Sequence, residues 1–282
     1  MTVILIIVYV WPYQASLPGL KYGPGFVVRQ TSFMISNVIP VGGAFGLAVQ
    51  YSMLGSYGYG AAETTAAIGI TSTWNTFVTL SLPVFGSIAL IAIGQGTEQA
   101  YTLAGVGLLA IGVFVAIFWS DESARRIGHI GDRIVGWVYG LFKKEPSFDV
   151  VGWTVNFRGS TVDVIRSRWA VITGSSHLQQ FLQFLILWAA VYAIQIGSSA
   201  PVTFVEAFVA YAFGRLASFI PITPGGLGTV DAAITAILVA FGAANSDALA
   251  AVMVWRVLTY FPQVFIGLGT FLFWRRKQHK AA

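Results

Sequence analysis

The chain has 282 residues, of which 56% are apolar, 15% aromatic and only 10% charged, and its mean hydropathy is +0.74. A soluble domain carries roughly a quarter charged residues, so this chain could not coat a soluble core of its size. Soluble enzymes and nucleic-acid binders are therefore excluded. Continuous apolar runs of about 20 residues, without the alternation of a β-barrel, predict an all-α, polytopic helical membrane protein.

The net charge of +5 is unevenly distributed. Eight of the 16 Lys and Arg residues lie between Arg125 and Arg168, and four more lie in the last eight residues. Because basic residues gather in cytoplasmic loops, this pattern predicts a cytoplasmic C-terminus. The chain has no cysteine and three well-separated histidines, so no metal site, other cofactor or nucleic-acid partner is expected.

The apolar runs predict elements at residues 1–12, 26–40, 41–58, 62–94, 98–119, 177–197, 201–220, 222–242 and 246–274. The first run is short for a span and lacks the basic region and cleavage site of a signal peptide, so we expect a trimmed N-terminus. Residues 120–176 form a polar stretch with two amphipathic pieces, 124–142 and 149–169, which we expect to be a cytoplasmic connector.

The charge pattern also fixes the direction of the longer runs. Run 62–94 is expected to cross outward and 98–119 to return to the cytoplasm. Run 177–197 then crosses outward, and 246–274 returns. Residues 201–242 therefore begin and end outside, either as two full crossings or as a re-entrant hairpin.

An internal repeat is predicted within this single membrane domain. At an offset of 181 residues, several unusual positions coincide: Ile39-Pro40 with Ile220-Pro221, Trp74 with Trp255, and Gly86 with Gly267. Repeat one covers about 26–94 and repeat two about 201–274, each with a Pro/Gly-broken hairpin and a long third helix. Because the third helices run in opposite directions, the copies are expected to be inverted, as in transporters. Lys21 and Arg29 place the chain before 26–58 inside, with the same two alternatives for that hairpin.

Three charged residues lie within apolar segments of repeat two: Arg215, Asp231 and Arg256. A guanidinium at mid-helix costs roughly 2.5–3.5 kcal/mol on insertion scales, so it normally faces a partner or a wet cavity. One interpretation is an ion pair between Asp231 and either arginine that fastens helices together. The other is a polar substrate path, since the planar guanidinium binds phosphate through two hydrogen bonds.

The break in repeat two reads Pro-Ile-Thr-Pro-Gly-Gly-Leu-Gly-Thr-Val-Asp over residues 221–231. The prolines end one helix, and Gly225, Gly226 and Gly228 permit close backbone approach. Thr229 is a candidate N-cap of the next helix, whose N-terminal amides could bind an anion. A tight turn without a ligand is the alternative.

The equivalent break in repeat one contains Gly42 and Gly46, a spacing that favours close helix packing. The residues of repeat one that correspond to Arg215, Asp231 and Arg256 are uncharged: Met34, Gln50 and Asn75. We therefore predict that the charge of the site comes from repeat two.

Residues 224–231, Pro-Gly-Gly-Leu-Gly-Thr-Val-Asp, followed by Val-Trp-Arg-Val-Leu-Thr-Tyr at 254–260, resemble the signature of the lysylphosphatidylglycerol synthase transmembrane, or flippase-like, family. Asp231 stands where that signature usually has Glu, and the Arg and Glu often found in the first break are absent. The resemblance covers the chain from about residue 26 onward.

The resemblance implies handling of lipid headgroups. In the synthases a membrane domain is thought to flip aminoacylated phosphatidylglycerol that a separate cytosolic domain makes. Only eight residues follow Trp274, so we expect a stand-alone membrane domain that is not an enzyme. The predicted function is translocation of a phospholipid or of a polyprenyl-phosphate-linked lipid across a bacterial cytoplasmic (inner) membrane. A separate lipid-modifying enzyme could act as a partner. The alternative is a membrane-embedded component or enzyme of lipid-linked glycan or glycolipid synthesis.

The substrate-binding residues predicted for this function are those of the second repeat: Arg215, Arg256, Asp231, Gly225, Gly226, Gly228 and Thr229.

The predicted topology can be tested directly because the chain has no native cysteine. Single cysteines at Ser198 and Asp247 should react with a membrane-impermeant maleimide from outside intact cells, whereas one at Ser147 should react only after the membrane is opened. Labelling at Ser147 from outside would contradict the topology.

Overall fold

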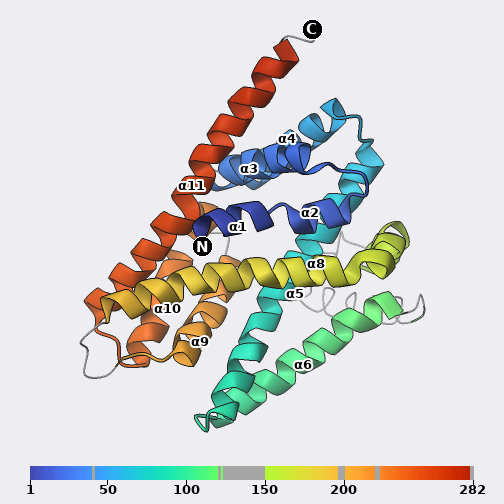
Figure 1. The fold of residues 1–282 in the computed structure, drawn as a ribbon. Helices are drawn as coiled ribbons and strands as arrows, with labels where there is room; N and C mark the ends of the chain where they lie inside the picture. Colours follow the sequence, from blue (N-terminus) through green and yellow to red (C-terminus); the bar gives the residue numbers. More distant parts are fainter. Residues whose placement is uncertain (40–41, 120–121, 123–149, 196–200, 220–222, 280–282) are drawn as a thin grey trace, which may run out of the picture.

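The structure of the chain, a computed structural model, describes residues 1–39, 42–119, 122, 150–195, 201–219 and 223–279. Within these residues every regular element is a helix, which confirms the predicted all-α class (Figure 1). In chain order the elements are α1 (Thr2–Val8), α2 (Trp11–Ser16), α3 (Tyr22–Val38), α4 (Gly42–Ser56), α5 (Ala61–Ala92), α6 (Glu98–Trp119), α8 (Val150–Ile194), α9 (Phe204–Gly214), the 3₁₀ helices η1 (Arg215–Phe219) and η2 (Pro224–Gly226), α10 (Thr229–Ala240) and α11 (Asn245–His279).

The described residues include three helices that are long and apolar enough to cross a membrane: α5, residues Arg166–Ile194 of α8, and residues Asn245–Gln278 of α11. The predicted runs 62–94 and 246–274 coincide with α5 and α11, and the run 98–119 is the 22-residue helix α6. The chain is therefore a polytopic helical membrane protein, as its composition predicts.

Helix α8 differs from the prediction because it is continuous over 45 residues. The sequence predicts a break between the amphipathic piece 149–169 and the apolar run 177–197, but α8 passes through both. The segment contains no proline, and a change from polar to apolar composition does not by itself end a helix. The other predicted amphipathic piece, 124–142, lies outside the described residues.

Two short helical hairpins contain the predicted breaks. The first pairs α3 with α4, and the second pairs α9 and η1 with η2 and α10. At 1.5 Å per residue, the 15 residues of α4 and the 12 of α10 extend about 22 and about 18 Å, short of a hydrocarbon core of roughly 30 Å. These lengths favour re-entrant hairpins over full crossings, and their depth in a bilayer stays a prediction.

Glycine lets the two helices of the first hairpin approach closely. A Cβ on Gly42 would lie 2.4 Å from the carbonyl oxygen of Ile35, and one on Gly46 would overlap the hydroxyl of Ser36. Both contacts join α4 to α3, so the Gly42–Gly46 spacing serves close packing, as the sequence predicts.

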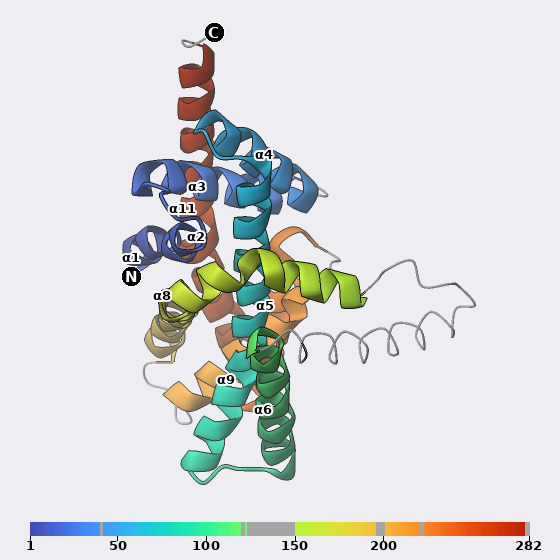
Figure 2. The same ribbon diagram turned by 90° about the vertical axis from the view of Figure 1, so that its right-hand side faces the viewer.

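The helices of the two predicted copies follow the same order at the offset of 181 residues. Helix α3 corresponds to α9 with η1, α4 to η2 with α10, and α5 to α11. Figures 1 and 2 show α5 and α11 running in opposite directions, with α3 and α4 toward one end of the molecule and α9 and α10 toward the other. This arrangement is the one expected of inverted copies, and their inversion across a membrane stays a prediction.

The repeated glycines pack each long helix against the hairpin of the other copy. A Cβ on Gly86 of α5 would lie 3.4 Å from the side chain of Val209 in α9. A Cβ on Gly267 of α11 would lie 2.4 Å from the carbonyl oxygen of Gln30 in α3. The contacts are related by the repeat but unequal in closeness, so Gly267 tolerates no side chain whereas Gly86 has room for a methyl group.

The repeated tryptophans both bind α8. Trp74 Nε1 donates a hydrogen bond to Oγ1 of Thr173 at 2.8 Å, and Trp255 Nε1 donates to the carbonyl oxygen of Gln183 at 3.0 Å. The largest core cluster surrounds Trp255, which meets Tyr211 edge to face. Helix α8 is thereby fixed to the long helix of each copy.

We expect the substitution Gly267→Ala to destabilise the protein, because the added methyl group would press against the backbone of α3. Overpacking of this kind costs about 1–3 kcal/mol. The control is Gly269→Ala in the same helix, where a Cβ meets no atom within 4 Å. Thermal unfolding in detergent should show a lower Tm for Gly267→Ala alone, and equal Tm values for the two variants would contradict the packing described.

Candidate functional site

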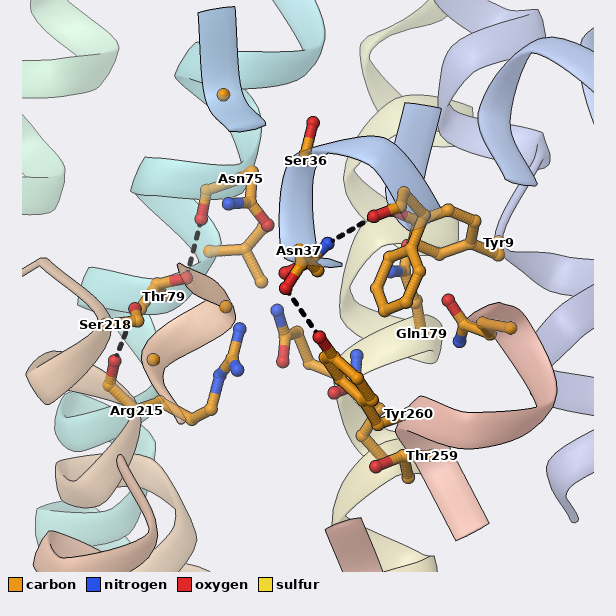
Figure 3. A pocket seen from close by; sticks show the side chains of 18 of the residues that line it. Tyr9, Ser36, Asn37, Asn75, Thr79, Gln179, Arg215, Ser218, Thr259 and Tyr260 are labelled. Atoms are coloured by element: carbon orange, nitrogen blue, oxygen red, sulfur yellow. Dashed lines mark hydrogen bonds between the residues drawn. The ribbon is translucent and has the colours of Figure 1, made fainter. Parts of the chain in front are cut away.

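A polar cavity of about 960 Å³ lies where the two hairpins meet (Figure 3). The first hairpin contributes Asn37 and Gly42 from either side of its break, and the second contributes Gly225 and Gly226. Helices α5, α8 and α11 complete the wall. The cavity is within the size range of ligand sites, roughly 300–1,000 Å³. Both predicted breaks therefore border one polar space.

The two hairpin tips touch at this cavity. The hydroxyl of Tyr260 in α11 donates a hydrogen bond to the carbonyl oxygen of Asn37 at 2.6 Å, and a Cβ on Gly225 would lie 2.6 Å from Asn37 Oδ1 (Figure 3). Asn37 in turn donates its side-chain N–H to the carbonyl of Phe33 at 2.7 Å. Asn37 is thus the point at which repeat one meets the break and the long helix of repeat two.

The glycines of the second break adopt backbone angles that other residues rarely take. Gly225, Gly226 and Gly228 have φ values of 63°, 66° and 86°. Gly225 and Gly226 line the cavity, whereas the structure places Gly228 at the N-cap of α10, where a Cβ would point into open space. Gly228 is therefore needed for its backbone angle, and Gly225 is needed for both its angle and its closeness to Asn37.

Asp231 and Arg256 form a buried ion pair. Arg256 Nε donates to Asp231 Oδ1 at 2.8 Å, and Arg256 Nη2 donates to the same oxygen. Arg256 is 9% exposed and Asp231 is 5% exposed. Arg256 also lines the cavity, whereas Asp231 lies outside its wall. Of the two arginines that the sequence offers as partners for Asp231, the structure selects Arg256.

Asp231 also replaces Thr229 as the cap of α10. Its Oδ2 accepts a hydrogen bond from the backbone N–H of Gly228 at 2.8 Å, because a carboxylate three residues into a helix can reach back to the N-cap. Thr229 is the first helical residue and donates its hydroxyl to the carbonyl of Gly226 at 3.3 Å. The prediction of Thr229 as N-cap is wrong, and the anion that the end of α10 holds is the protein's own carboxylate.

Arg215 remains available to a ligand. It begins η1 directly after Gly214, where a Cβ would lie 2.3 Å from the Ile234 side chain, so the close crossing of α9 and α10 sets its position. Figure 3 shows its guanidinium directed into the cavity. Its Nε is buried without a hydrogen-bond partner, and within the described residues it forms no ion pair.

Arg29 is a further arginine of the cavity wall, and the sequence pattern uses it only to place the chain before 26–58 inside. It lies within α3, and its guanidinium carbon is 4.6 Å from the ring centre of Tyr9 and 5.1 Å from that of Tyr13. Its Nε is also buried without a partner. The prediction that repeat one contributes no charge is therefore wrong. The sequence does contain an indication of this position, because Arg29 falls inside the predicted apolar run 26–40, where an arginine normally faces a partner or a polar cavity.

The remaining polar wall consists of neutral groups. Six side-chain amides line the cavity: Asn37, Asn75, Gln179, Gln180, Gln183 and Gln263. Eight serine and threonine hydroxyls join them, and the ionised side chains among the described lining residues are Arg29, Arg215 and Arg256. Of eight buried polar atoms without a hydrogen-bond partner in the described chain, four belong to residues of this wall. The wall is suited to an anion that carries further polar groups.

Together the helices and the cavity define a multi-pass membrane protein with a polar cavity whose wall carries three arginines. The chain belongs to the family described as lysylphosphatidylglycerol synthase TM region, whose family model matches residues 17–267. It is 24% identical over 245 residues to a UPF0104 membrane protein of Methanothermobacter thermautotrophicus, an alignment covering 83% of this chain and 70% of that relative. No solved structure matches the chain.

Replacing Asp231 with alanine should destabilise the protein strongly, because it leaves the charge of Arg256 buried without a partner and removes the cap of α10. Breaking a buried pair from one side costs about 3–5 kcal/mol. The exposed Asp247→Ala is the matched control. Denaturant unfolding in mixed micelles should show a large loss for Asp231→Ala and partial recovery in Asp231→Ala/Arg256→Met. Equal stability of the two single variants would contradict the role of the pair.

Proposed function

We propose that the protein is a flippase-like lipid translocator, which moves a phospholipid or a lipid-linked anionic headgroup across the cytoplasmic membrane. The observation that carries the proposal is the pair of cavity arginines, Arg29 and Arg215, that lack a carboxylate partner in the described chain. Both side chains are partly buried, and the Nε of each is buried without a hydrogen-bond partner. A partly buried guanidinium without a counter-charge is unfavourable, so a site that keeps two of them is suited to bind an anion.

The phosphate of a lipid headgroup fits this site chemically. A guanidinium offers a planar set of N–H donors that matches two phosphate oxygens, and Arg29 and Arg215 come from different repeats. A phosphate bound between them would be held from both hairpins. The acyl chains would remain in the surrounding lipid, while only the headgroup enters the polar space.

Five of the predicted site residues then have separate parts in this proposal. Arg215 binds the phosphate, and Arg256 contributes charge to the wall while the Asp231 carboxylate holds it in place. Gly225 and Gly226 let the backbone border the cavity without side chains that would fill it. Because translocation requires the headgroup to pass both hairpin tips, the contact between Tyr260 and Asn37 lies on the proposed path.

The substitution Arg215→Gln should slow lipid flipping at least about tenfold, because a charge-assisted hydrogen bond contributes about 1.5–3 kcal/mol. The assay follows headgroup-labelled phosphatidylglycerol and a polyprenyl-phosphate sugar in proteoliposomes. Arg275→Gln, which removes an exposed positive charge at the end of α11, is the matched control. Flipping that is unchanged in folded Arg215→Gln would refute the arginine mechanism, and its absence in the wild-type protein would refute translocation of these lipids.

A further inference from the structure

The charge of the cavity wall has a single sign. The ionised side chains among its described residues are all arginines, and Asp231, the carboxylate paired with one of them, already accepts hydrogen bonds from Arg256 and from the N–H of Gly228. A headgroup that carries an ammonium would meet guanidinium groups and no carboxylate among the described lining residues. Like charges repel each other, so the wall disfavours amine headgroups.

The neutral amides of the wall exceed what a phosphate alone requires. Asn75, Gln179 and Gln183 are at least partly exposed, and their side chains form no hydrogen bond within the part of the chain that the structure describes. Figure 3 shows Asn75 and Gln179 bordering the same cavity as the guanidinium of Arg215. An amide both donates and accepts hydrogen bonds, whereas a phosphate diester only accepts them. The amide oxygens are therefore free to accept hydrogen bonds from a ligand that also donates.

The threonines of the wall add further acceptors. Thr71, Thr79 and Thr259 each donate the hydroxyl hydrogen to a carbonyl four residues earlier in their helix, at 2.8, 2.8 and 2.7 Å. Their oxygen lone pairs remain available to accept from a ligand. A ligand group that both donates and accepts hydrogen bonds and carries no charge can therefore bind to this wall. Alcohol hydroxyls are such groups.

We propose that the cavity selects a lipid headgroup composed of a phosphate and an uncharged polyol, such as glycerol or inositol, over headgroups that carry an amine. The proposal rests on the proposed translocation of lipids and names the class of lipid that is moved. The arginines bind the phosphate, and the amides and threonine oxygens bind the hydroxyl groups.

The first experiment compares flipping of four labelled lipids in proteoliposomes. We expect phosphatidylinositol and phosphatidylglycerol to move at least about tenfold faster than phosphatidylethanolamine and lysyl-phosphatidylglycerol, because the latter two carry ammonium groups. Equal or faster movement of the amine lipids would overturn the headgroup class and leave translocation standing. Uptake of free inositol 1-phosphate into the vesicles without movement of phosphatidylinositol would overturn the assignment to a lipid.

The second experiment measures binding of soluble probes to the purified protein, so it does not depend on transport. Inositol 1-phosphate should bind more tightly than inorganic phosphate, and phosphoethanolamine should bind more weakly than inorganic phosphate. If the probes follow this order while no lipid moves, the proposed function fails and the headgroup class stands. Inorganic phosphate binding as tightly as inositol 1-phosphate would overturn the role of the polyol.

A double variant separates the two parts of the site. Gln179→Met/Gln183→Met removes two amides of similar size from α8 and should lower the preference for inositol 1-phosphate over inorganic phosphate at least about fivefold, with phosphate affinity retained. Gln278→Met, at an exposed position near the end of α11, should change neither quantity. If the folded double variant keeps the same preference for inositol 1-phosphate over inorganic phosphate, the proposal that these amides bind hydroxyl groups is overturned.

Discussion

The ion pair between Asp231 and Arg256 is the interaction on which the arrangement of the cavity depends. One carboxylate binds the guanidinium of α11 with one oxygen and caps α10 with the other, so the restart of the second hairpin and the long helix are held together at one point. A buried pair of this kind contributes little net stability, but removing either partner is costly. The pair therefore fixes the geometry of the break, and it consumes one of the three cavity arginines.

Close backbone contact at glycines brings the two hairpins within reach of each other. Gly267 packs α11 on α3, Gly214 packs α9 on α10, and Gly225 lies against Asn37. Together these contacts place the tip of one hairpin against the tip of the other. In the predicted re-entrant topology, the polar backbone at the hairpin tips must be satisfied inside the protein, and the cavity lies at those tips. The contact between the hairpins and the position of the cavity thus both depend on the two Pro/Gly breaks in the helices.

The sequence predicts the features that arise from local composition. The bounds of α5, α6 and α11 follow from continuous apolar runs, and the break at Gly225 follows from a cluster of residues that cannot remain helical. The start of α8 could not be placed, because amphipathic and apolar stretches propagate a helix equally well. In the sequence pattern Arg29 serves only to place the preceding chain inside, although it falls within the predicted apolar run 26–40. The sequence leaves open which of the two arginines pairs with Asp231. That pairing depends on tertiary geometry, which the spacing of the residues in the sequence does not predict.

The two arginines left for a ligand differ in what compensates their burial. Arg29 lies over the rings of Tyr9 and Tyr13, and such cation–π contacts offset part of the cost of removing a guanidinium from water. Arg215 has no ring over its guanidinium and no carboxylate partner within the described residues. An anion that enters the cavity therefore relieves more of the desolvation cost at Arg215 than at Arg29. For this reason affinity should depend most strongly on Arg215, while Arg29, held between two rings, supplies a fixed positive charge from the other repeat.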